Sequence, residues 1–178
     1  MKKLIIITTP VLIGAACLLS ACGGKSGYGS SAADSTATMV QKNKQTAMAT
    51  EMALNKHDVA GVFKDCSADF VEYQSGESKP MKIDSAKASF KDYLAAFPDV
   101  KGDNLVYLGQ GDTVVVMGTW TGTFKGAMGP MKPTGKTFKV FDEDIFSFNK
   151  DGKITSHRSV QSFNTYITQV SAMAPSAH

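Results

Sequence analysis

The sequence predicts an α+β domain in which helices come first and an antiparallel sheet follows. Apolar residues recur at helical spacing in the first half of the chain, most clearly in the group before Pro98, which comprises Ala86, Phe90, Tyr93, Leu94 and Phe97. In the second half apolar and polar residues alternate, and turn-forming residues occupy 109–112 and 149–152 between the alternating segments. Helices followed by strands that are joined by tight turns are typical of α+β folds.

Three helices are expected. The first covers residues 39–56 and has Val40, Met48 and Met52 in one phase. The second is short and begins at Asp58, whose side chain can cap it. Its apolar stripe consists of Val59, Val62, Phe63 and Cys66, so Cys66 is predicted to be buried and inert. The third begins at Asp84 or Ser85 and ends at Phe97, because the residue before a proline rarely stays helical.

Five strands are expected, at residues 69–73, 105–108, 113–124, 137–148 and 153–163. The strand 113–124 has the strongest pattern, with an apolar face formed by Val114, Val116, Trp120 and Phe124. Gly118 and Gly122 lie on this same face, where a missing side chain lets a sheet bend or leaves room for a bound molecule. The sequence therefore predicts that this strand forms the wall of a cavity.

Residues 1–21 have the layout of a secretory signal peptide, with Lys2 and Lys3 before an apolar run that is shorter than the roughly 20 residues needed to cross a bilayer. The sequence Leu19-Ser20-Ala21-Cys22 resembles the bacterial lipobox, which implies cleavage before Cys22 and lipidation of that cysteine. The alternative is a plain secretion signal with an incidental cysteine. A lipid anchor places the domain in the cell envelope, outside the cytoplasm, and Gly23 resembles a signal for the outer membrane where a source has two membranes.

The rest of the chain divides into a tether, a domain and a tail. Residues 22–38 are mainly glycine, serine, alanine and threonine, which predicts a flexible tether. Residues 39–171 are expected to form one domain and residues 172–178 a short tail. The formal net charge of the chain is only +3, two of it from the predicted signal peptide, and Arg158 is the single arginine. Nucleic acid is therefore not an expected partner.

Several short motifs occur in order along the domain: Ala96-Phe97-Pro98-Asp99, Gly111-Asp112, Gly118-Thr119-Trp120-Thr121-Gly122, Pro133-Thr134-Gly135-Lys136, Asp151-Gly152-Lys153-Ile154, and Gln169. Together they resemble the SnoaL-like branch, the polyketide and ester cyclases, of the nuclear transport factor 2-like superfamily, over roughly residues 40–170. The resemblance implies a cone in which a strongly curved antiparallel sheet wraps around helices and encloses a pocket. It also implies a small-molecule ligand and a homodimer formed through the outer face of the sheet.

The sequence departs from the cyclase pattern at the positions that carry the chemistry. Where cyclase members have a tryptophan and, four residues later, an acid–base aspartate on the last strand, this chain has Arg158 and Ser162. A serine cannot replace a carboxylate as a proton shuttle near neutral pH. Trp120 also replaces the histidine of the Gly-Thr-His-Thr-Gly motif. Cyclase activity is therefore not expected from these positions.

Asp144 and Arg158 are the charged candidates for the pocket. Asp144 shares strand parity with Phe138 and Phe146, so it points inward among aromatic rings, unless a bulge near residues 141–143 turns it outward. Arg158 shares parity with Ile154, which predicts an inward guanidinium paired with Asp144 or with an acidic ligand. The alternative for Arg158 is an exposed surface position. The remaining residues predicted to contact a ligand are Ser162, Trp120, Phe124, Phe138, Phe146 and Tyr73.

His157 has the opposite parity and is expected on the outer or dimer face of the sheet. The three histidines share no metal-ligand spacing with one another or with Cys66, and no phosphate-binding glycine loop is found, so neither a metal nor a cofactor is expected. Three functions remain, in this order. The first is a membrane-tethered module that binds a small, mostly apolar or acidic molecule. The second is a cyclase, isomerase or hydratase that uses Asp144 as its acid–base group. The third is an interaction scaffold whose pocket is filled by its own side chains.

Overall fold

The computed structural model describes residues 30–74 and 77–171 of the 178-residue chain. The predicted signal peptide, the lipidation site Cys22 and the tail at 172–178 lie outside the described residues. Within the described residues the chain forms helices α1 (Ser30–Asn55), α2 (Val59–Val62), α3 (Ile83–Ala96) and α4 (Phe163–Val170). The strands are β1 (Cys66–Tyr73), β2 (Met81–Lys82), β3 (Lys101–Gln110), β4 (Thr113–Thr123), β5 (Thr137–Phe148) and β6 (Ile154–Ser159).

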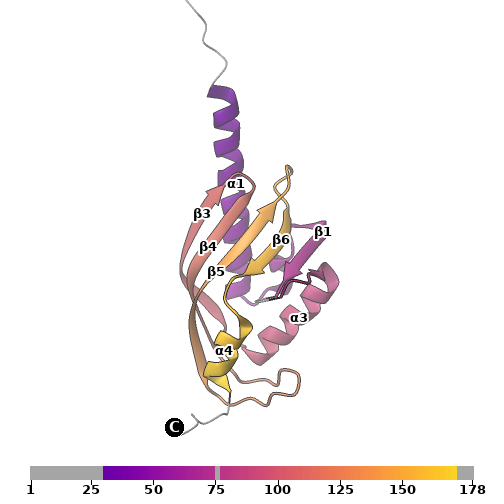
Figure 1. Ribbon diagram of the computed structural model, residues 1–178, viewed down its shortest axis with the longest axis vertical. Coiled ribbons are helices and arrows are strands. Elements are labelled where there is room, and N and C mark those ends of the chain that lie inside the picture. Colours follow the sequence, from indigo (N-terminus) through magenta and orange to yellow (C-terminus); the bar gives the residue numbers. More distant parts are fainter. Residues whose placement is uncertain (1–29, 75–76, 172–178) are drawn as a thin grey trace, which may run out of the picture.

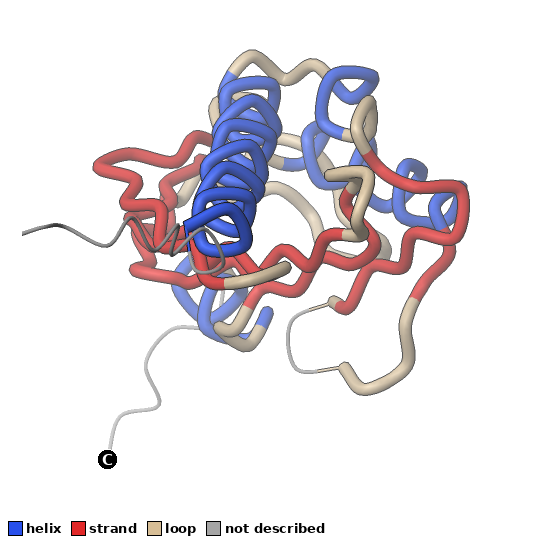
Figure 2. Tube along the Cα trace, turned by 90° about the horizontal axis from the view of Figure 1, so that it is seen from above, coloured by secondary structure: helices blue, strands red, loops and turns tan. Residues whose placement is uncertain are grey.

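The strands form one sheet in the order β2-β1-β6-β5-β4-β3. Strands β3 to β6 are an antiparallel meander, as predicted, and β1 joins β6 in parallel. The sheet is strongly curved and stays open, as Figures 1 and 2 show. Helix α1 packs on β3 and β4, α3 packs on β1 and β2, and α4 packs on β5. The result is the predicted α+β cone, with helices on the concave side of the sheet.

Strand β4 alternates without interruption between buried and half-buried residues, and the buried set includes Val114, Val116 and Trp120, as predicted. An aromatic cluster closes the narrow end of the core. Phe97, which follows α3, lies 5.4 Å from Phe124 and 5.2 Å from Phe138 between ring centroids. These rings join the end of α3 to β4 and β5, so the third helix and the meander share one core.

Gly118 is required by a close approach between β3 and β4. A Cβ atom at this position would lie 2.5 Å from Cδ2 of Leu105 and 2.9 Å from the backbone oxygen of Asp103. The pairing of β3 with β4 shifts register between Asp103 and Val106, and Asn104 has a positive φ of 56°. The irregularity turns Leu105 over Gly118 and bends the sheet, as the glycine pattern predicted.

The observed elements differ from the predicted ones at several ends. Helix α1 begins at Ser30, so residues 30–38, predicted to be tether, are helical, and no glycine or proline lies among them to interrupt the helix. Met48 and Met52 are exposed, which shows that the predicted phase of α1 is wrong. The N-cap of α3 is Lys82 rather than Asp84 or Ser85. The last strand ends at Ser159, and the chain then forms α4, which the sequence analysis missed.

Candidate functional site

A cavity of about 750 Å³ lies between the concave face of the sheet and the helices. Its walls are mostly apolar, and the largest apolar side chains that line it are Phe63, Phe70, Phe90, Trp120, Phe146 and Phe163. Residues 127–129 of the loop between β4 and β5 also contribute to the lining. The size suits a small organic molecule with one to three rings. The structure therefore contains the predicted pocket. The third hypothesis, a scaffold whose pocket is filled by its own side chains, does not agree with this cavity.

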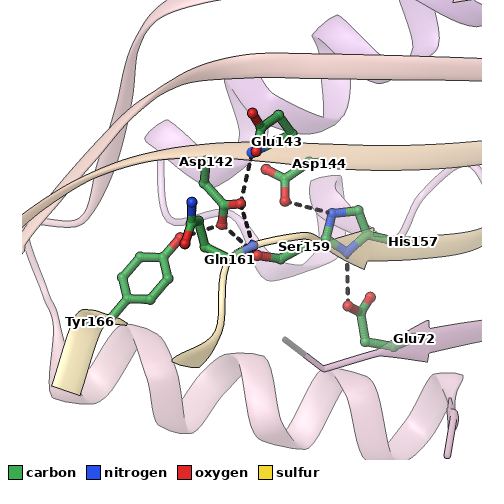
Figure 3. A network of polar contacts seen from close by, with 8 residues as sticks. All are labelled: Glu72, Asp142, Glu143, Asp144, His157, Ser159, Gln161 and Tyr166. Carbon is green, nitrogen blue, oxygen red and sulfur yellow. Dashed lines mark hydrogen bonds and ion pairs between the residues drawn. The ribbon is translucent and has the colours of Figure 1, made fainter. Parts of the chain in front are cut away.

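Three ionisable side chains form a chain of contacts inside this cavity (Figure 3). His157 on β6 lies between two carboxyl groups, with Nδ1 at 2.8 Å from Oε1 of Glu72 and Nε2 at 3.3 Å from Oδ1 of Asp144. Glu72 comes from β1 and Asp144 from β5, the two neighbours of β6 in the sheet. The pairing of Glu72 with His157 follows from the parallel register of β1 and β6. Three adjacent strands therefore build one polar group on an otherwise apolar wall.

Burial and charge act together on this group. Asp144 is only 7% exposed, and its burial raises the pKa of its carboxyl group. The hydrogen bond from His157 and the charge of His157 oppose this change. Burial alone would lower the pKa of His157, but the carboxylate of Glu72 and the hydrogen bonds to Asp144 and Glu72 outweigh it and raise this pKa well above its usual value. Nε2 of His157 and Oδ1 of Asp144 lie 3.3 Å apart and form an ion pair when the imidazole is protonated. A pair of this kind can accept and return a proton at the cavity wall.

A second carboxyl group, Asp142, is 1% exposed and is occupied by structural hydrogen bonds. Its Oδ1 accepts from the backbone N–H groups of Glu143 and Gln161, at 2.7 and 2.8 Å. Its Oδ2 accepts from the hydroxyls of Ser159 and Tyr166, as drawn in Figure 3. These contacts join β5 to the end of β6 and to α4. Asp142 therefore holds the site together, and it has little capacity left for a ligand.

A third carboxyl group reaches the cavity from α1. Glu51 is 2% exposed, and its Oε2 is buried with no hydrogen-bond partner among the described residues. Burial, together with the charge of Asp144, raises the pKa of Glu51 to about 8, while His157 acts to lower it. The cavity thus contains a carboxyl group that stays protonated at neutral pH.

The stability of the domain is expected to fall as the pH rises. Glu51 has a folded pKa of about 8 against an ordinary value of 4.5, so the folded state retains a proton that the unfolded state has lost between these values. The contribution of Glu51 to stability is therefore fully present below about pH 4.5 and is lost as the pH rises through about 8. The raised pKa of His157 likewise makes the folded state less stable as the pH rises. Urea unfolding should show a loss on the order of 3 kcal/mol between about pH 5 and pH 9.

Glu51→Gln should flatten this pH dependence, because the substitution removes the titrating group. Glu143→Gln is the matched control, since Glu143 lies on the outer face of β5. A pH profile of Glu51→Gln that follows the wild type would show that Glu51 is ionised in the folded protein at neutral pH.

The structure places Asp144 inward, and β5 alternates from Phe138 to Phe148 without the bulge that the alternative required. The prediction for Arg158 and His157 is wrong, because their orientations are exchanged. The pairing of β5 with β6 shifts register between Ser147 and Phe148, which leaves Thr155 as an extra residue. His157 consequently shares the inward face with Phe146, and Arg158 turns to the other face of the sheet.

Arg158 does not line the cavity, although both of its contact partners, Tyr73 and Glu77, do. Its guanidinium lies 4.0 Å from the ring centroid of Tyr73, and Nη1 donates to the backbone oxygen of Glu77 at 3.4 Å. Neither the predicted pair with Asp144 nor an arginine that orients an acidic ligand in the cavity is compatible with this position. Tyr73 contributes to the cavity lining beneath Arg158.

The other predicted ligand contacts divide into two groups. Trp120 and Phe146 line the cavity, whereas Phe124 and Phe138 are packed in the aromatic cluster at its narrow end. Ser162 is exposed and is the N-cap of α4, where its hydroxyl accepts from the backbone N–H of Asn164 at 3.3 Å. The prediction that Ser162 contacts a ligand is therefore wrong, because the chain leaves the sheet before reaching it.

Sequence reasoning missed Glu51, Glu72, Asp142 and Tyr166. A signal existed for Asp142, which has the same strand parity as Asp144. A weaker signal existed for Glu51, four residues after the buried Ala47 on α1. Glu72 and Tyr166 enter through the parallel β1–β6 pair and through α4, neither of which has a local pattern.

Metal-binding clusters and membrane-spanning helices are both absent from residues 30–74 and 77–171. No cluster of three or more histidine, cysteine, aspartate or glutamate side chains in these ranges has the geometry to hold a metal ion. No helix in the same ranges combines the length and the apolar character needed to cross a membrane.

Comparison with known proteins gives a family and a set of structural neighbours. The sequence profile of SnoaL-like polyketide cyclase matches residues 44–170. A comparison with curated protein sequences gives no significant match. Among solved structures, AclR from Streptomyces galilaeus, a candidate hydroxylase, is 24% identical, with a TM-score of 0.65 over 72% of this chain and 95% of its own.

Two further neighbours are candidate polyketide cyclases. The protein from Xanthomonas campestris pv. campestris is 18% identical, with a TM-score of 0.67 over 75% of this chain and 99% of its own. IdmH from Streptomyces antibioticus is 20% identical, with a TM-score of 0.61 over 71% of this chain and 96% of its own. At these identities the neighbours establish the fold, and the chemistry has to be argued from the residues of this chain.

Proposed function

Because this chain belongs to the SnoaL-like polyketide cyclase family, we propose that it is an acid–base enzyme that moves a proton on a small, mostly apolar carbonyl compound. The observation that carries this proposal is the pair formed by the buried Asp144 and the half-buried His157 in the wall of a mostly apolar cavity of about 750 Å³. Proton-transfer groups with strongly changed pKa values in such cavities are typical of catalytic sites. The reaction class is cyclisation or isomerisation through an enol.

The three side chains have separate roles in this proposal. The Glu72 carboxylate accepts a hydrogen bond from Nδ1–H of His157 and so fixes the orientation of the ring. Nε2 of His157 stabilises the negative charge of Asp144 at Oδ1. Among the described residues, Oδ2 of Asp144 has no hydrogen-bond partner, so this oxygen is available to the substrate. Asp144 is the catalytic residue, and Glu72 and His157 are positioning residues.

The proposed step balances without an added reagent. Oδ2 of Asp144 removes a proton from a carbon next to a carbonyl group, and the electron pair of the C–H bond forms a C=C bond while the carbonyl π electrons move to oxygen. Where a C=C bond of the substrate is conjugated with the enolate, return of the proton to the far end of the conjugated system gives an isomer. Attack of the enolate carbon on a second carbonyl of the molecule closes a ring, and the alkoxide that forms takes the proton back from Asp144. The charge of His157 favours the ionised form of Asp144 before the step, against the effect of burial.

The proposal accounts for the missing aspartate at the usual cyclase position. Ser162 caps α4 and cannot transfer protons, but Asp144 supplies a carboxylate from the neighbouring strand β5 to the same cavity. The hypothesis of a module that only binds a ligand depended on an inward Arg158, which lies outside the cavity. Small-molecule binding remains part of the proposal as the first step of the reaction.

Hydrogen exchange of 2-tetralone tests the proposal. This bicyclic ketone is neutral, fits the cavity volume, and carries acidic C–H bonds next to its carbonyl group. In D₂O the wild-type protein should accelerate deuterium incorporation, measured by mass spectrometry. Asp144→Asn should reduce the rate by about 100-fold or more, because general acid–base groups typically contribute 10²–10⁴-fold. His157→Gln should reduce it less, because Asp144 keeps its second oxygen.

Binding is measured separately from exchange. Trp120 is the single tryptophan of the chain and lines the cavity, so its fluorescence reports occupancy directly. Asp144→Asn should bind 2-tetralone as the wild type does and should fail only in exchange. Wild-type exchange no faster than that of Asp144→Asn would overturn the proposed function.

The site of action is a further part of the proposal. The lipobox-like sequence that ends at Cys22 supports a lipid anchor and a place in the cell envelope. The exposed Val106, Leu108 and Phe141, on β3 and β5, support the expected homodimer through the outer face of the sheet.

A further inference from the structure

We propose that Glu51 is a second catalytic residue, whose protonated carboxyl group donates a hydrogen bond to the carbonyl oxygen of the substrate. This inference rests on the proposed function and adds the group that stabilises charge on oxygen while Asp144 removes a proton from carbon. It also narrows the substrate to a neutral ketone or 1,3-dicarbonyl compound.

The position of Glu51 has no structural explanation. Its Oε2 is buried without a partner among the described residues, although an unsatisfied buried polar atom destabilises the folded state. The residue lines the same cavity as Asp144 and His157, but it comes from α1, which packs on β3 and β4. A ligand in the cavity is thus contacted by Asp144 from the sheet and by Glu51 from the helix. A bound carbonyl oxygen could accept a hydrogen bond from this carboxyl group.

The surroundings of Glu51 favour its neutral form. The titratable groups that act on it are Asp144 of β5 and His157 of β6, and Glu51 in turn acts on the hydroxyl of Tyr107 of β3. His157 is already engaged by Glu72 and Asp144, so its charge is largely compensated before it reaches Glu51. Burial and the negative charge of Asp144 therefore prevail and keep the proton on Glu51 at neutral pH. Only a protonated carboxyl group can donate to a carbonyl oxygen.

The two carboxyl groups divide one reaction between them. Asp144 takes the proton from carbon, the C–H electron pair becomes the C=C bond, and the carbonyl π electrons move to the oxygen that faces Glu51. The hydrogen bond from Glu51 then strengthens, because the oxygen gains negative charge, and one preorganised donor of this kind typically contributes about 10²–10³-fold to kcat. If the proton crosses fully, an enol and a Glu51 carboxylate form, and the proton returns when the product carbonyl is restored. No net charge leaves the cavity.

The arrangement also selects against acidic ligands. Glu51, Glu72, Asp142 and Asp144 line the cavity, and within the described residues His157 is the only basic side chain that does so. A ligand carboxylate would face repulsion and would have no free cation to pair with. The acidic ligand expected from the sequence depended on Arg158, which is on the other face of the sheet. The inferred substrate is therefore neutral.

A pair of ligands isolates the hydrogen bond of Glu51. 2-Tetralone has the carbonyl oxygen, and tetralin has the same fused rings without it. With Trp120 fluorescence as the readout, Glu51→Leu should weaken the binding of 2-tetralone about tenfold and leave tetralin binding unchanged or stronger. Glu51→Gln should weaken 2-tetralone binding less, because its amide N–H still donates. Glu143→Gln, the same chemical change on the outer face of β5, should bind both ligands as the wild type does.

The pH profile gives an independent readout. Wild-type affinity for 2-tetralone should fall as the pH rises through about 8, where Glu51 loses its proton, and Glu51→Gln should show no such fall. Equal weakening of both ligands by Glu51→Leu would overturn the inference, since it would show that Glu51 only shapes the cavity. Unchanged 2-tetralone binding in Glu51→Leu would overturn it as well.

Failure of the inference is distinguishable from failure of the proposed function. If the Glu51 variants exchange 2-tetralone protons at the wild-type rate while Asp144→Asn does not, only the role of Glu51 is wrong. If the wild type neither binds nor exchanges 2-tetralone, the proposed function fails and the role of Glu51 fails with it. The full result supports both: exchange is lost in Asp144→Asn with binding retained, and carbonyl-dependent binding and exchange are both reduced in Glu51→Leu.

Discussion

Asp142→Ala is expected to lower the free energy of unfolding by about 3–5 kcal/mol, the range found when one partner of a buried charged network is removed. Asp142 accepts four hydrogen bonds, from two backbone N–H groups and from the hydroxyls of Ser159 and Tyr166. Alanine would leave these donors buried without an acceptor. It would also weaken the attachment of α4 to β5, because Tyr166 of the helix and Gln161 just before it both donate to this carboxylate.

Urea denaturation measures the loss, and Asp103→Ala is the control. Asp103 forms an ion pair with Lys101 at 2.8 Å, but both side chains are about half exposed, so its removal should cost at most about 1 kcal/mol. Equal losses in the two variants would mean that Asp142 is not a structural centre. In that case Asp142 would have to be reconsidered as a member of the proton-transfer group.

Phe138→Ala should lower the free energy of unfolding by about 3–5 kcal/mol, as for other fully buried aromatic side chains. Phe138 is 0% exposed, and its ring lies 5.2 Å from that of Phe97 and 5.0 Å from that of Tyr166, in edge-to-face contact with both. Alanine leaves a hole between β5, α4 and the end of α3. The contacts at the narrow end of the cone should therefore be the first to open when the variant unfolds.

Phe141→Ala is the matched control for Phe138→Ala, because it removes the same ring three residues away on the same strand. Phe141 is 57% exposed on the outer face, so its loss should cost less than about 1 kcal/mol in a monomer. The comparison is made by urea unfolding at several protein concentrations. A large, concentration-dependent cost at Phe141 would indicate that the outer face is covered by another copy of the chain, while a small cost at Phe138 would contradict the described core.

The sheet was largely predictable from local pattern, and β5 shows why. From Phe138 to Phe148 every second residue is buried, so strand parity alone places Asp144 in the cavity. The same reasoning failed on β6, because one extra residue at Thr155 exchanges the two faces of the strand. His157 and Arg158 consequently exchanged roles. A register shift depends on how neighbouring strands pair, and a single strand carries little record of it.

Helix α1 was predicted to exist, but its buried face was not. The inner side of α1 carries Asn43, Ala47, Thr50 and Glu51, and the apolar Met48 and Met52 are exposed. Apolar periodicity predicts which side of a helix enters a packed core. Here the inner side of the helix lines part of a cavity with polar groups, so the usual signal is reversed. The departure from the pattern coincides with the candidate site, where local rules are most often broken.

The N-terminal part of helix α1 extends beyond the sheet. Its residues 34–38 are exposed, and Figure 1 shows the N-terminal turns extending past the edge of the sheet. Contact with β3 begins near Val40 and Lys44, which lie against Gly109. At about 1.5 Å per residue, residues 30–38 form an arm about 14 Å long. Residues 30–38 therefore act as a helical spacer that holds the N-terminal end of the described chain away from the edge of the sheet.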